Sequence, residues 1–511
     1  MVGTLSRRAF LKYVAWLAAN SALPASPRLR LSGASAHGAT KVSSARPNFV
    51  FILADDLGWA DVGCYGSDLH ETPNIDGLAR QGMRFSDAYA AAPVCSPTRA
   101  SIMTGKYPAR LHMTIWYESS ANPPRNRRLI PPVTQGNMPH EQVTIAEVLK
   151  NAGYFTAHIG KWHLGDAAHY PETQGFDVNI GGTFWGAPTT FFYPYGGPSR
   201  WGGEFRYVPH LEFGSEGEYL TDRLTNEALR VIERTKDKPF FLNLCYHTVH
   251  TPIEGKPELV EHYKKKVKPG MHHQNYEYAA MVHSLDENLG RIIAKISELG
   301  IAERTVIIFF SDNGGYINKY NQKTVTNNYP LRSGKGSLYE GGTRAPLIVQ
   351  WPGVTKAGSL CRQPVSSIDF YSTILGITGL DGDQKHNADM DGLSLVPLLK
   401  NPTAKLKRDT LYWHYPHYYA TTSPVSSIRR DDWKLLEYFP APESSDASWG
   451  GGEDKRIELY NLRKDIGEEN NLAERMPEKA EELRKRLHAW RKAVDAQMPT
   501  PNPKYSSKVG R

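Results

Sequence analysis

The chain has 511 residues, and its contents of 40% hydrophobic and 22% charged residues are typical of a globular protein with a sizeable core. Because this length exceeds that of one ordinary core, we expect a large domain and a smaller one. The formal net charge is +8, but residues 1–36 contain five basic residues and no acidic residue, so the remainder carries only +3, which does not indicate nucleic-acid binding.

The first 36 residues have the features of an export signal. Arg7 and Arg8 precede a short apolar run, a pattern typical of twin-arginine signals, which the export machinery recognises as an address. An ordinary secretory signal with a basic start is the alternative. Neither this run nor any later one is long enough to span a bilayer, so we expect no stable membrane anchor and a periplasmic or secreted bacterial protein.

From Pro47 to about residue 400, predicted strands alternate with predicted helices. Apolar runs that indicate buried strands lie at 48–56, 155–160, 239–250, 305–315 and 345–353. Helical patterns lie at 72–82, 141–153, 221–235 and 276–299. The alternation predicts an α/β fold with a large, mostly parallel sheet sandwiched by helices, and we assign the large domain to 45–400.

Beyond about residue 405 the pattern changes to short strands with the spacing of a meander, followed by an amphipathic helix at 477–498. The strand candidates lie at 409–419, 426–439 and 456–462. We therefore predict a smaller antiparallel α+β subdomain at 405–498, with an exposed loop at 440–454 and a surface tail at 499–511.

Polar residues gather at the carboxyl ends of the predicted strands, where doubly wound sheets bind their ligands. One strand ends in Asp55 and Asp56, and another ends in Asp312 and Asn313. Three carboxylates at one sheet edge would repel one another unless a cation neutralised them. Because all the donors are oxygens, the set favours a hard divalent ion, Ca²⁺ or Mg²⁺, over zinc.

Cationic and imidazole side chains accompany these carboxylates. Two further strands end in Lys161 with His163 and in His247 with His250. Lys335 lies between two glycines, which leave room for a ligand to approach, and Arg99, Lys161 and Lys335 are candidates to line one pocket. Together with a metal they would form a site for a tetrahedral oxyanion whose charge must be stabilised.

The chain has four cysteines and no C-x-x-C pair, so neither a disulfide framework nor a cysteine–zinc site is indicated, although a bridge from Cys64 to Cys245 or Cys361 stays open. Cys95 starts a predicted helix that ends at Gly105, and a helix N-terminus favours negative charge. A buried structural cysteine and a thiolate nucleophile are the simple interpretations. A soft sulfur is a poor ligand for a hard ion, so an oxygen nucleophile would suit the metal site better.

The segment CSPTRASIMTGKYP, which starts at Cys95, resembles the signature of the type I, formylglycine-dependent sulfatases of the alkaline phosphatase superfamily. The segments ADDLGWADVGCYG, GKWHLG, VHTP, SDNGG and GKGSLYEGGTRAP follow the family's order and extend the resemblance over nearly the whole mature chain. Thr98 stands where serine is common, but a small hydroxyl is kept and we expect the modification to survive. The resemblance implies an alkaline-phosphatase-like fold, with the catalytic domain at 45–400.

The resemblance also implies a cofactor and a modification. In this family a separate formylglycine-generating enzyme oxidises the signature cysteine to formylglycine, and the hydrated aldehyde, a gem-diol, attacks the sulfur of a sulfate ester. Modified Cys95 would bind Ca²⁺, with Mg²⁺ as the alternative, together with Asp55, Asp56, Asp312 and Asn313.

Roles for the remaining site residues follow from the same resemblance. Arg99 and Lys161 would steady the gem-diol, and His163 would form a hydrogen bond with one of its hydroxyls. His250 and Lys335 would hold the substrate sulfate, and one of them would protonate the departing alcohol.

The C-terminal segments at 411–419 and 426–439 resemble bacterial polysaccharide sulfatases, and their aromatic residues suit stacking on a sugar. The aromatic residues are Tyr412, Trp413, Tyr415, Tyr418 and Tyr419. We expect His414 and His417 to contact the sugar, and the alternative is that the aromatic side chains form the subdomain core. A sulfated saccharide is thus favoured over a small aryl sulfate as the natural substrate.

Two other functions remain as alternatives. The first is a phosphodiesterase or phosphonate monoester hydrolase of the same superfamily, some of which also use formylglycine. The second is a non-catalytic glycan-binding protein in which Cys95 stays a thiol. The full set of carboxylate, lysine and histidine partners argues against the second, because a pure binder does not need a metal site at the strand ends.

Overall fold

The structure is a computed structural model that describes residues 46–200, 202–211, 213–439 and 457–505. The predicted signal at 1–36 and the predicted loop at 440–454 lie outside these residues. Among the described residues, no helix is both long and apolar enough to cross a membrane. All four cysteines are free thiols, so the bridge from Cys64 that the sequence left open is not formed.

The main element of the fold is an eight-stranded, mostly parallel sheet, as the sequence predicts. Its strands in spatial order are β14 (Ser359–Cys361), β2 (Met83–Phe85), β13 (Leu347–Gln350), β10 (Thr305–Ser311), β1 (Asn48–Ala54), β9 (Phe240–Cys245), β5 (Phe155–Gly160) and β6 (Val178–Ile180). Only β13 runs antiparallel to its neighbours β10 and β2. The parallel group β10, β1, β9 and β5 therefore brings four carboxyl ends to one edge of the sheet.

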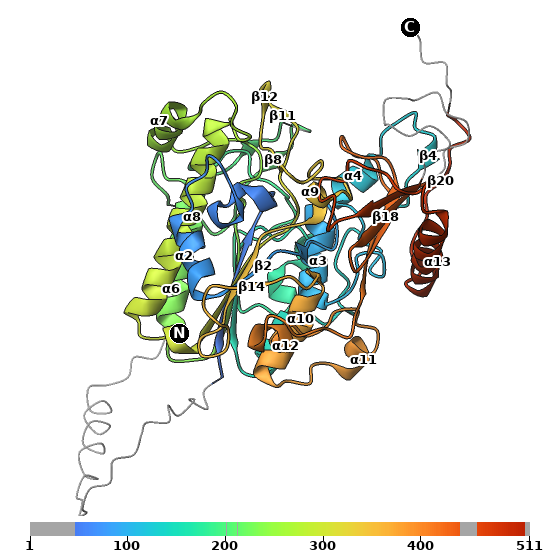
Figure 1. Ribbon diagram of the computed structural model, residues 1–511. Coiled ribbons are helices and arrows are strands. Elements are labelled where there is room, and N and C mark those ends of the chain that lie inside the picture. The colour runs from blue at the N-terminus through green and yellow to red at the C-terminus, as the bar shows by residue number, and fades with distance from the viewer. Residues whose placement is uncertain (1–45, 201, 212, 440–456, 506–511) are drawn as a thin grey trace, which may run out of the picture. The chain divides into compact units, whose positions relative to one another are not determined.

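Helices cover both faces of this sheet (Figure 1). The first face carries α2 (Pro73–Gln81), α6 (Leu220–Thr235) and α8 (Tyr276–Glu298), and the second carries α3 (Cys95–Thr104), α5 (Ile145–Asn151) and α10 (Asp369–Thr378). Successive side chains of β1 alternate between the two cores, with Ile52 in the first and Phe51 in the second. Each buried side chain of this size contributes about 2 kcal/mol relative to exposure, so the sheet is stabilised from both sides.

The ends of the helices follow from capping residues in the sequence. α2 begins at Pro73 after Thr72 and stops before Gly82, as predicted. α5 begins at Ile145, later than the predicted start at residue 141, because the Thr144 side chain accepts a hydrogen bond from the backbone N–H of Glu147 and caps the helix there.

A second, antiparallel sheet follows near the C-terminus, as predicted. Its strands in order are β16 (Thr410–Tyr415), β17 (Val425–Arg430), β18 (Trp433–Tyr438) and β19 (Ile457–Asn461). The segment 426–439 thus forms a hairpin of two strands that turns at Asp431 and Asp432. One face of the sheet packs against α13 (Pro477–Ala493), and the other packs against residues such as Tyr89 and Leu338 from the larger part of the fold.

Short elements complete the described part of the chain. The helices are α4 (Tyr117–Ala121), α7 (Pro257–Lys266), α9 (Glu340–Thr343), α11 (Gln384–Asn387) and α12 (Val396–Lys400). The paired strands are β3 (Ala88–Tyr89) with β15 (Val365–Ser366), β4 (Leu129–Ile130) with β20 (Thr500–Pro501), β7 (Gly197–Pro198) with β8 (Phe205–Arg206), and β11 (Lys319–Tyr320) with β12 (Lys323–Thr324). The 3₁₀ helices are η1 (Trp59–Asp61), η2 (Gly63–Tyr65), η3 (Ala167–His169), η4 (Pro171–Thr173) and η5 (Ala302–Arg304).

A buried ionic contact joins the second sheet to the segment that carries Lys335. Lys434 of β18 lies with its ammonium 2.8 Å from a carboxylate oxygen of Glu340 in α9 and 3.0 Å from one of Glu468, and all three side chains are fully buried. Removal of one partner from such a contact typically costs about 3–5 kcal/mol, because the other charges stay buried without compensation. The second sheet therefore fixes α9 and the loop just before it.

Candidate active site

The carboxyl ends of the four parallel strands bring the predicted polar residues together. Asp55 and Asp56 follow β1, and Asp312 follows β10. Lys161 follows β5, and His250 lies beyond the end of β9. These segments are neighbours because β10, β1, β9 and β5 are consecutive in the sheet, which is the arrangement that the strand-end rule predicts.

Two of the buried carboxylates are held by cations from other elements. The ammonium of Lys161 donates to Asp55 Oδ2 at 2.6 Å. The guanidinium of Arg99 in α3 donates to Asp312 Oδ2 through Nε at 3.0 Å and Nη2 at 2.7 Å. None of these four side chains is more than 3% exposed, so each charge depends on its partner.

Asp56 has a strained backbone and several polar contacts. Its φ of 61° lies in the left-handed region, which residues other than glycine adopt at a cost of about 1 kcal/mol or more. Lys335 Nζ donates to Asp56 Oδ2 at 2.8 Å, and Asn313 Nδ2 donates to Oδ1 at 2.8 Å. Burial alone would raise the pKa of Asp56, but Lys335 and His250 lower it to about 2, so the carboxylate is ionised.

The donor set at this edge fits a hard divalent ion. Burial, reinforced by the neighbouring Asp55, raises the pKa of Asp312 to about 6, which is the effect of carboxylates crowded together in a buried position. Asn313 Oδ1 is buried and has no hydrogen-bond partner among the described residues. Carboxylate and amide oxygens are the ligands that Ca²⁺ prefers, so these residues could hold the ion that the sequence predicts.

Cys95 is the first residue of α3 and lies beside the carboxylates. Its side chain is 3% exposed, and Sγ lies 3.6 Å from Asp55 Oδ1. One ligand atom each of Asp55, Asp56, Cys95 and His250 lie within 4.8 Å of one another. Burial raises the pKa of the Cys95 thiol to about 12 despite nearby lysines, which disfavours the thiolate nucleophile that the sequence left open.

His163 contacts a carboxylate that the sequence analysis missed. Its Nε2 lies 3.6 Å from Glu118 Oε2, and both side chains line the same pocket. Burial outweighs this carboxylate and lowers the pKa of His163 to about 4, so the imidazole is neutral near pH 7. Glu118 belongs to α4, a single short helix in a long irregular segment, where neither periodicity nor a motif marks it.

The two histidines that follow β9 differ in their surroundings. His250 lines the pocket, and its Nδ1–H donates to the backbone oxygen of Thr251 at 2.8 Å. Burial and Lys335 lower the pKa of His250 to about 3. His247 is buried and does not line the pocket, and neither of its ring nitrogens has a hydrogen-bond partner within the described residues.

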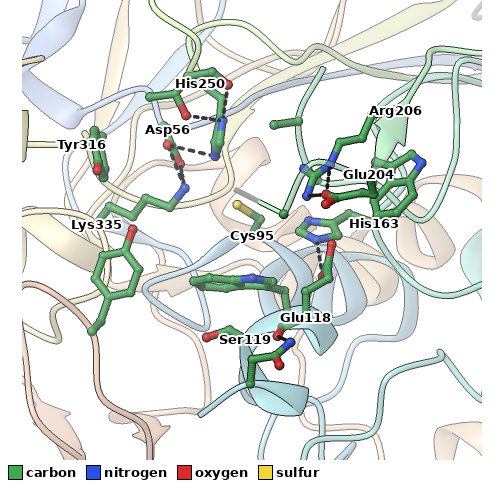
Figure 2. Close-up of a pocket in the computed structure, with 18 residues that line it drawn as sticks. Asp56, Cys95, Glu118, Ser119, His163, Glu204, Arg206, His250, Tyr316 and Lys335 are labelled. Carbon is green, nitrogen blue, oxygen red and sulfur yellow. Dashed lines mark hydrogen bonds and ion pairs between the residues drawn. The ribbon is translucent and has the colours of Figure 1, made fainter. Parts of the chain in front are cut away.

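A pocket of about 700 Å³ opens above Cys95 and the lysine and histidine side chains. Figure 2 shows Cys95, His163, His250 and Lys335 around this space. The lining also includes aromatic and polar residues that the sequence did not indicate: Trp116, Ser119, Asn122, Trp185, Glu204, Arg206 and Tyr316. Gly336 next to Lys335 has a φ of +87°, and a Cβ there would lie 1.9 Å from the ring of Tyr419, so glycine is required.

The expectation that His414 and His417 contact a sugar is wrong. His414 is buried between Ser426 Oγ and the backbone oxygen of Gln497, each at 2.8 Å, and His417 is bonded to Thr114 Oγ1 at 2.7 Å. The aromatic side chains of this segment do not all reach the pocket. Trp413 and Tyr415 pack in the core, whereas Tyr419 lines the pocket. Both faces of the second sheet are covered, which leaves its strands little surface for a ligand.

Comparisons with known proteins find relatives over most of the chain. The family model described as Sulfatase matches residues 47–380, and that described as N-sulphoglucosamine sulphohydrolase, C-terminal, matches residues 334–495. A sulfatase of Formosa agariphila is 32% identical over 513 residues, which cover 88% of this chain and 89% of that protein. Human N-acetylgalactosamine-6-sulfatase is 31% identical over 447 residues, which cover 83% and 80% respectively.

A solved structure is similar over most of the chain. Ps i-CgsB in complex with k-i-k-neocarrahexaose is 30% identical, with a TM-score of 0.70, and the match covers 91% of this chain and 95% of that one.

We predict that N313A weakens Ca²⁺ binding about tenfold, because it removes a neutral oxygen ligand whose bond to an ion is worth about 1.5 kcal/mol. Isothermal titration of the chelator-treated protein with Ca²⁺ measures the dissociation constant. N470A, at an exposed position, is the matched control and should bind as the wild type does. Equal affinity of N313A and wild type would contradict the predicted metal site.

Proposed function

The chain belongs to the sulfatase family of sulfuric ester hydrolases, and we propose that it removes sulfate from a sulfated carbohydrate by means of an oxidised Cys95 and a bound Ca²⁺. The observation that carries the proposal is the convergence of Cys95, buried carboxylates and cations at the base of one pocket. This combination suits the transfer of a tetrahedral anion to a fixed nucleophile.

The charge balance of the site favours an anionic substrate. At the strand ends, the buried ionic groups are three carboxylates and three cations, namely Asp55, Asp56, Asp312, Arg99, Lys161 and Lys335. These charges cancel, and the histidines are neutral, so a divalent cation would leave two positive charges at this buried edge. A sulfate ester, which carries one negative charge, would be attracted strongly there.

The oxygen nucleophile would come from residue 95. Oxidation of Cys95 to formylglycine and its hydration would supply hydroxyl groups, which an unmodified thiol with a pKa of about 12 cannot replace. Lys161, between Asp55 and this residue, would hold the hydroxyls in place. His163 is neutral near pH 7 and lines the same pocket, so it would accept the proton that a hydroxyl must lose.

Lys335 is the better candidate to protonate the departing alcohol, a choice that the sequence left open. Burial alone would lower the pKa of Lys335, but Asp56 raises it well above its usual range, so the side chain is protonated. His250 is neutral, and its one ring proton is held by the backbone oxygen of Thr251. His250 would therefore orient the substrate rather than act as the acid.

The pocket supports a carbohydrate substrate. Four aromatic side chains line it, from Trp116, Trp185, Tyr316 and Tyr419, and such flat apolar surfaces suit the faces of sugar rings. Polar side chains lie between them and can bond to hydroxyl groups. One compared structure holds k-i-k-neocarrahexaose and one relative is named N-acetylgalactosamine-6-sulfatase, and these names support a carbohydrate here.

The proposal requires partners outside the chain. A formylglycine-generating enzyme would have to oxidise Cys95, whose side chain is 3% exposed in the folded protein. The twin-arginine signal at 1–36 would export a chain that has already folded, so we propose that modification precedes export to the periplasm or beyond.

We predict that E118Q lowers kcat on an aryl sulfate about tenfold with little change in KM, because the amide orients His163 less firmly than the carboxylate does. The acidic limb of the pH–rate profile should also move to lower pH, because Glu118 raises the pKa of His163 and its loss lowers it. E141Q, at an exposed position, should leave both unchanged. A profile of E118Q that matches the wild type would rule out this positioning role.

We predict that C95S lowers sulfate release at least about thousandfold, because a serine sulfate ester has no second hydroxyl with which to expel the sulfate. Mass spectrometry of the wild type made with a formylglycine-generating enzyme should show the aldehyde at Cys95. C64A, which alters another free thiol, is the control and should stay active. Full activity of protein with an unmodified thiol at position 95 would end this part of the proposal.

We predict at least about a hundredfold preference in kcat/KM for sulfate esters over phosphate and phosphonate esters of the same aryl alcohol. A panel of defined sulfated saccharides, scored by sulfate release, would identify the sugar and the position. Faster hydrolysis of the phosphonate would favour the phosphonate monoester hydrolase instead. Glycan binding that C95A retains, together with no sulfate release by the wild type, would favour the non-catalytic alternative.

A further inference from the structure

A second cluster of metal-ligating side chains lies outside the pocket. Asp61 ends η1, His70 precedes α2, and His273 lies between α7 and α8. Their side chains are buried, at 0%, 5% and 3% exposure, and one ligand atom of each lies within 4.8 Å of the others. None of the three lines the catalytic pocket.

Both imidazoles of this cluster are held by oxygen acceptors on their Nδ1 side. His273 Nδ1 lies 2.6 Å from Asp68 Oδ1, and His70 Nδ1 lies 2.9 Å from the backbone oxygen of Asp61. Carboxylate and carbonyl oxygens only accept hydrogen bonds, so each Nδ1 carries a proton, and Nε2 is the ring atom through which a metal could bind. Metal-ligating histidines are typically oriented in this way by a carboxylate or a backbone oxygen.

The Nε2 atom of His273 has no hydrogen-bond partner among the described residues, although it is buried. It lies 3.2 Å from Asp61 Oδ1. Burial alone would lower the pKa of His273, but Asp61 and Asp68 raise it to about 9, so without a metal a proton on Nε2 joins the two side chains. A divalent ion bound by both atoms would take the place of that proton.

We propose that Asp61, His70 and His273 bind a zinc ion. Two imidazoles with one carboxylate form a donor set that zinc accepts readily, whereas Ca²⁺ and Mg²⁺ prefer oxygen atoms alone. Asp68 would support the site by holding His273, as its 2.6 Å contact indicates. The proposal does not depend on the reaction at Cys95.

The zinc ion would stabilise the segment that follows β1. Asp61 Oδ2 accepts hydrogen bonds from the backbone N–H of Gly58 at 2.7 Å and from Tyr278 Oη at 2.6 Å. The same Tyr278 Oη lies 3.4 Å from the backbone oxygen of Asp56. An ion on Asp61 would thereby fix the turn that holds Asp56 in its left-handed conformation.

The test is metal analysis of the whole purified chain in the presence of excess Ca²⁺, which keeps the oxygen-rich catalytic edge occupied. Elemental analysis should find about one zinc per chain in the wild type. Replacement of zinc by Co²⁺ should give the visible absorption of a nitrogen- and oxygen-ligated ion. H273Q should abolish both signals, whereas H272Q, which alters the exposed neighbouring histidine, should keep both.

A milder variant guards against misfolding of H273Q. D68N keeps all three ligands and removes only the support of His273, so it should weaken zinc binding at least about tenfold while the thermal transition stays cooperative. Wild-type protein that binds neither Zn²⁺ nor Co²⁺ would overturn the proposal and leave the cluster as a buried ion pair of a protonated His273 with two carboxylates. Zinc that H273Q retains in full would place the ion elsewhere and overturn it equally.

Discussion

The site depends on one electrostatic constraint, which is that three buried carboxylates share an edge of the sheet. At a separation of 4 Å and an effective dielectric constant of 20, each pair of like charges repels by about 4 kcal/mol. In the structure, Arg99, Lys161 and Lys335 offset this repulsion through direct contacts. These cations come from α3, from the end of β5 and from the loop before α9, so much of the fold serves to bring three distant segments to the same edge.

The residues at the centre of this site could be predicted, because a short stretch of sequence shows where a buried strand ends. Ligands generally bind at the carboxyl ends of such strands. A continuous apolar run followed by Asp55 and Asp56 marks a buried strand and the residues at its carboxyl end, and parallel neighbours bring similar residues beside it. The position of Cys95 could be predicted for a related reason, since Pro97 and Gly105 mark the start and the end of α3. The eight-stranded sheet follows from the same alternation of strands and helices.

The walls of the pocket could not be predicted, because they come from segments without a periodic pattern. Trp116 and Glu118 lie in a long connection, and their place depends on how that connection folds over the sheet. The aromatic residues of the second sheet show a further limit. The alternation of side chains along a strand shows which of them share a face, but it does not show what covers that face. Here α13 covers one face of the second sheet, and the larger part of the fold covers the other. Lys434 and Glu340 are 94 residues apart, a pairing that no spacing indicates.

Both proposed metal sites take a ligand from the segment that follows β1, but they differ in their donor atoms. This difference would direct different ions to the two sites. The edge at Asp56 offers mainly oxygens, from three carboxylates and Asn313, with the single imidazole of His250 beside them, its Nε2 3.6 Å from Asp56 Oδ2. The cluster at Asp61 instead offers two imidazoles with their Nδ1 protons fixed. The edge at Asp56 would therefore favour a hard ion such as Ca²⁺, and the cluster at Asp61 would favour zinc, a borderline ion. Tyr278 also links the two sites, because its hydroxyl contacts the Asp61 carboxylate and the backbone oxygen of Asp56. An ion bound at Asp61 would therefore limit the movement of Asp56.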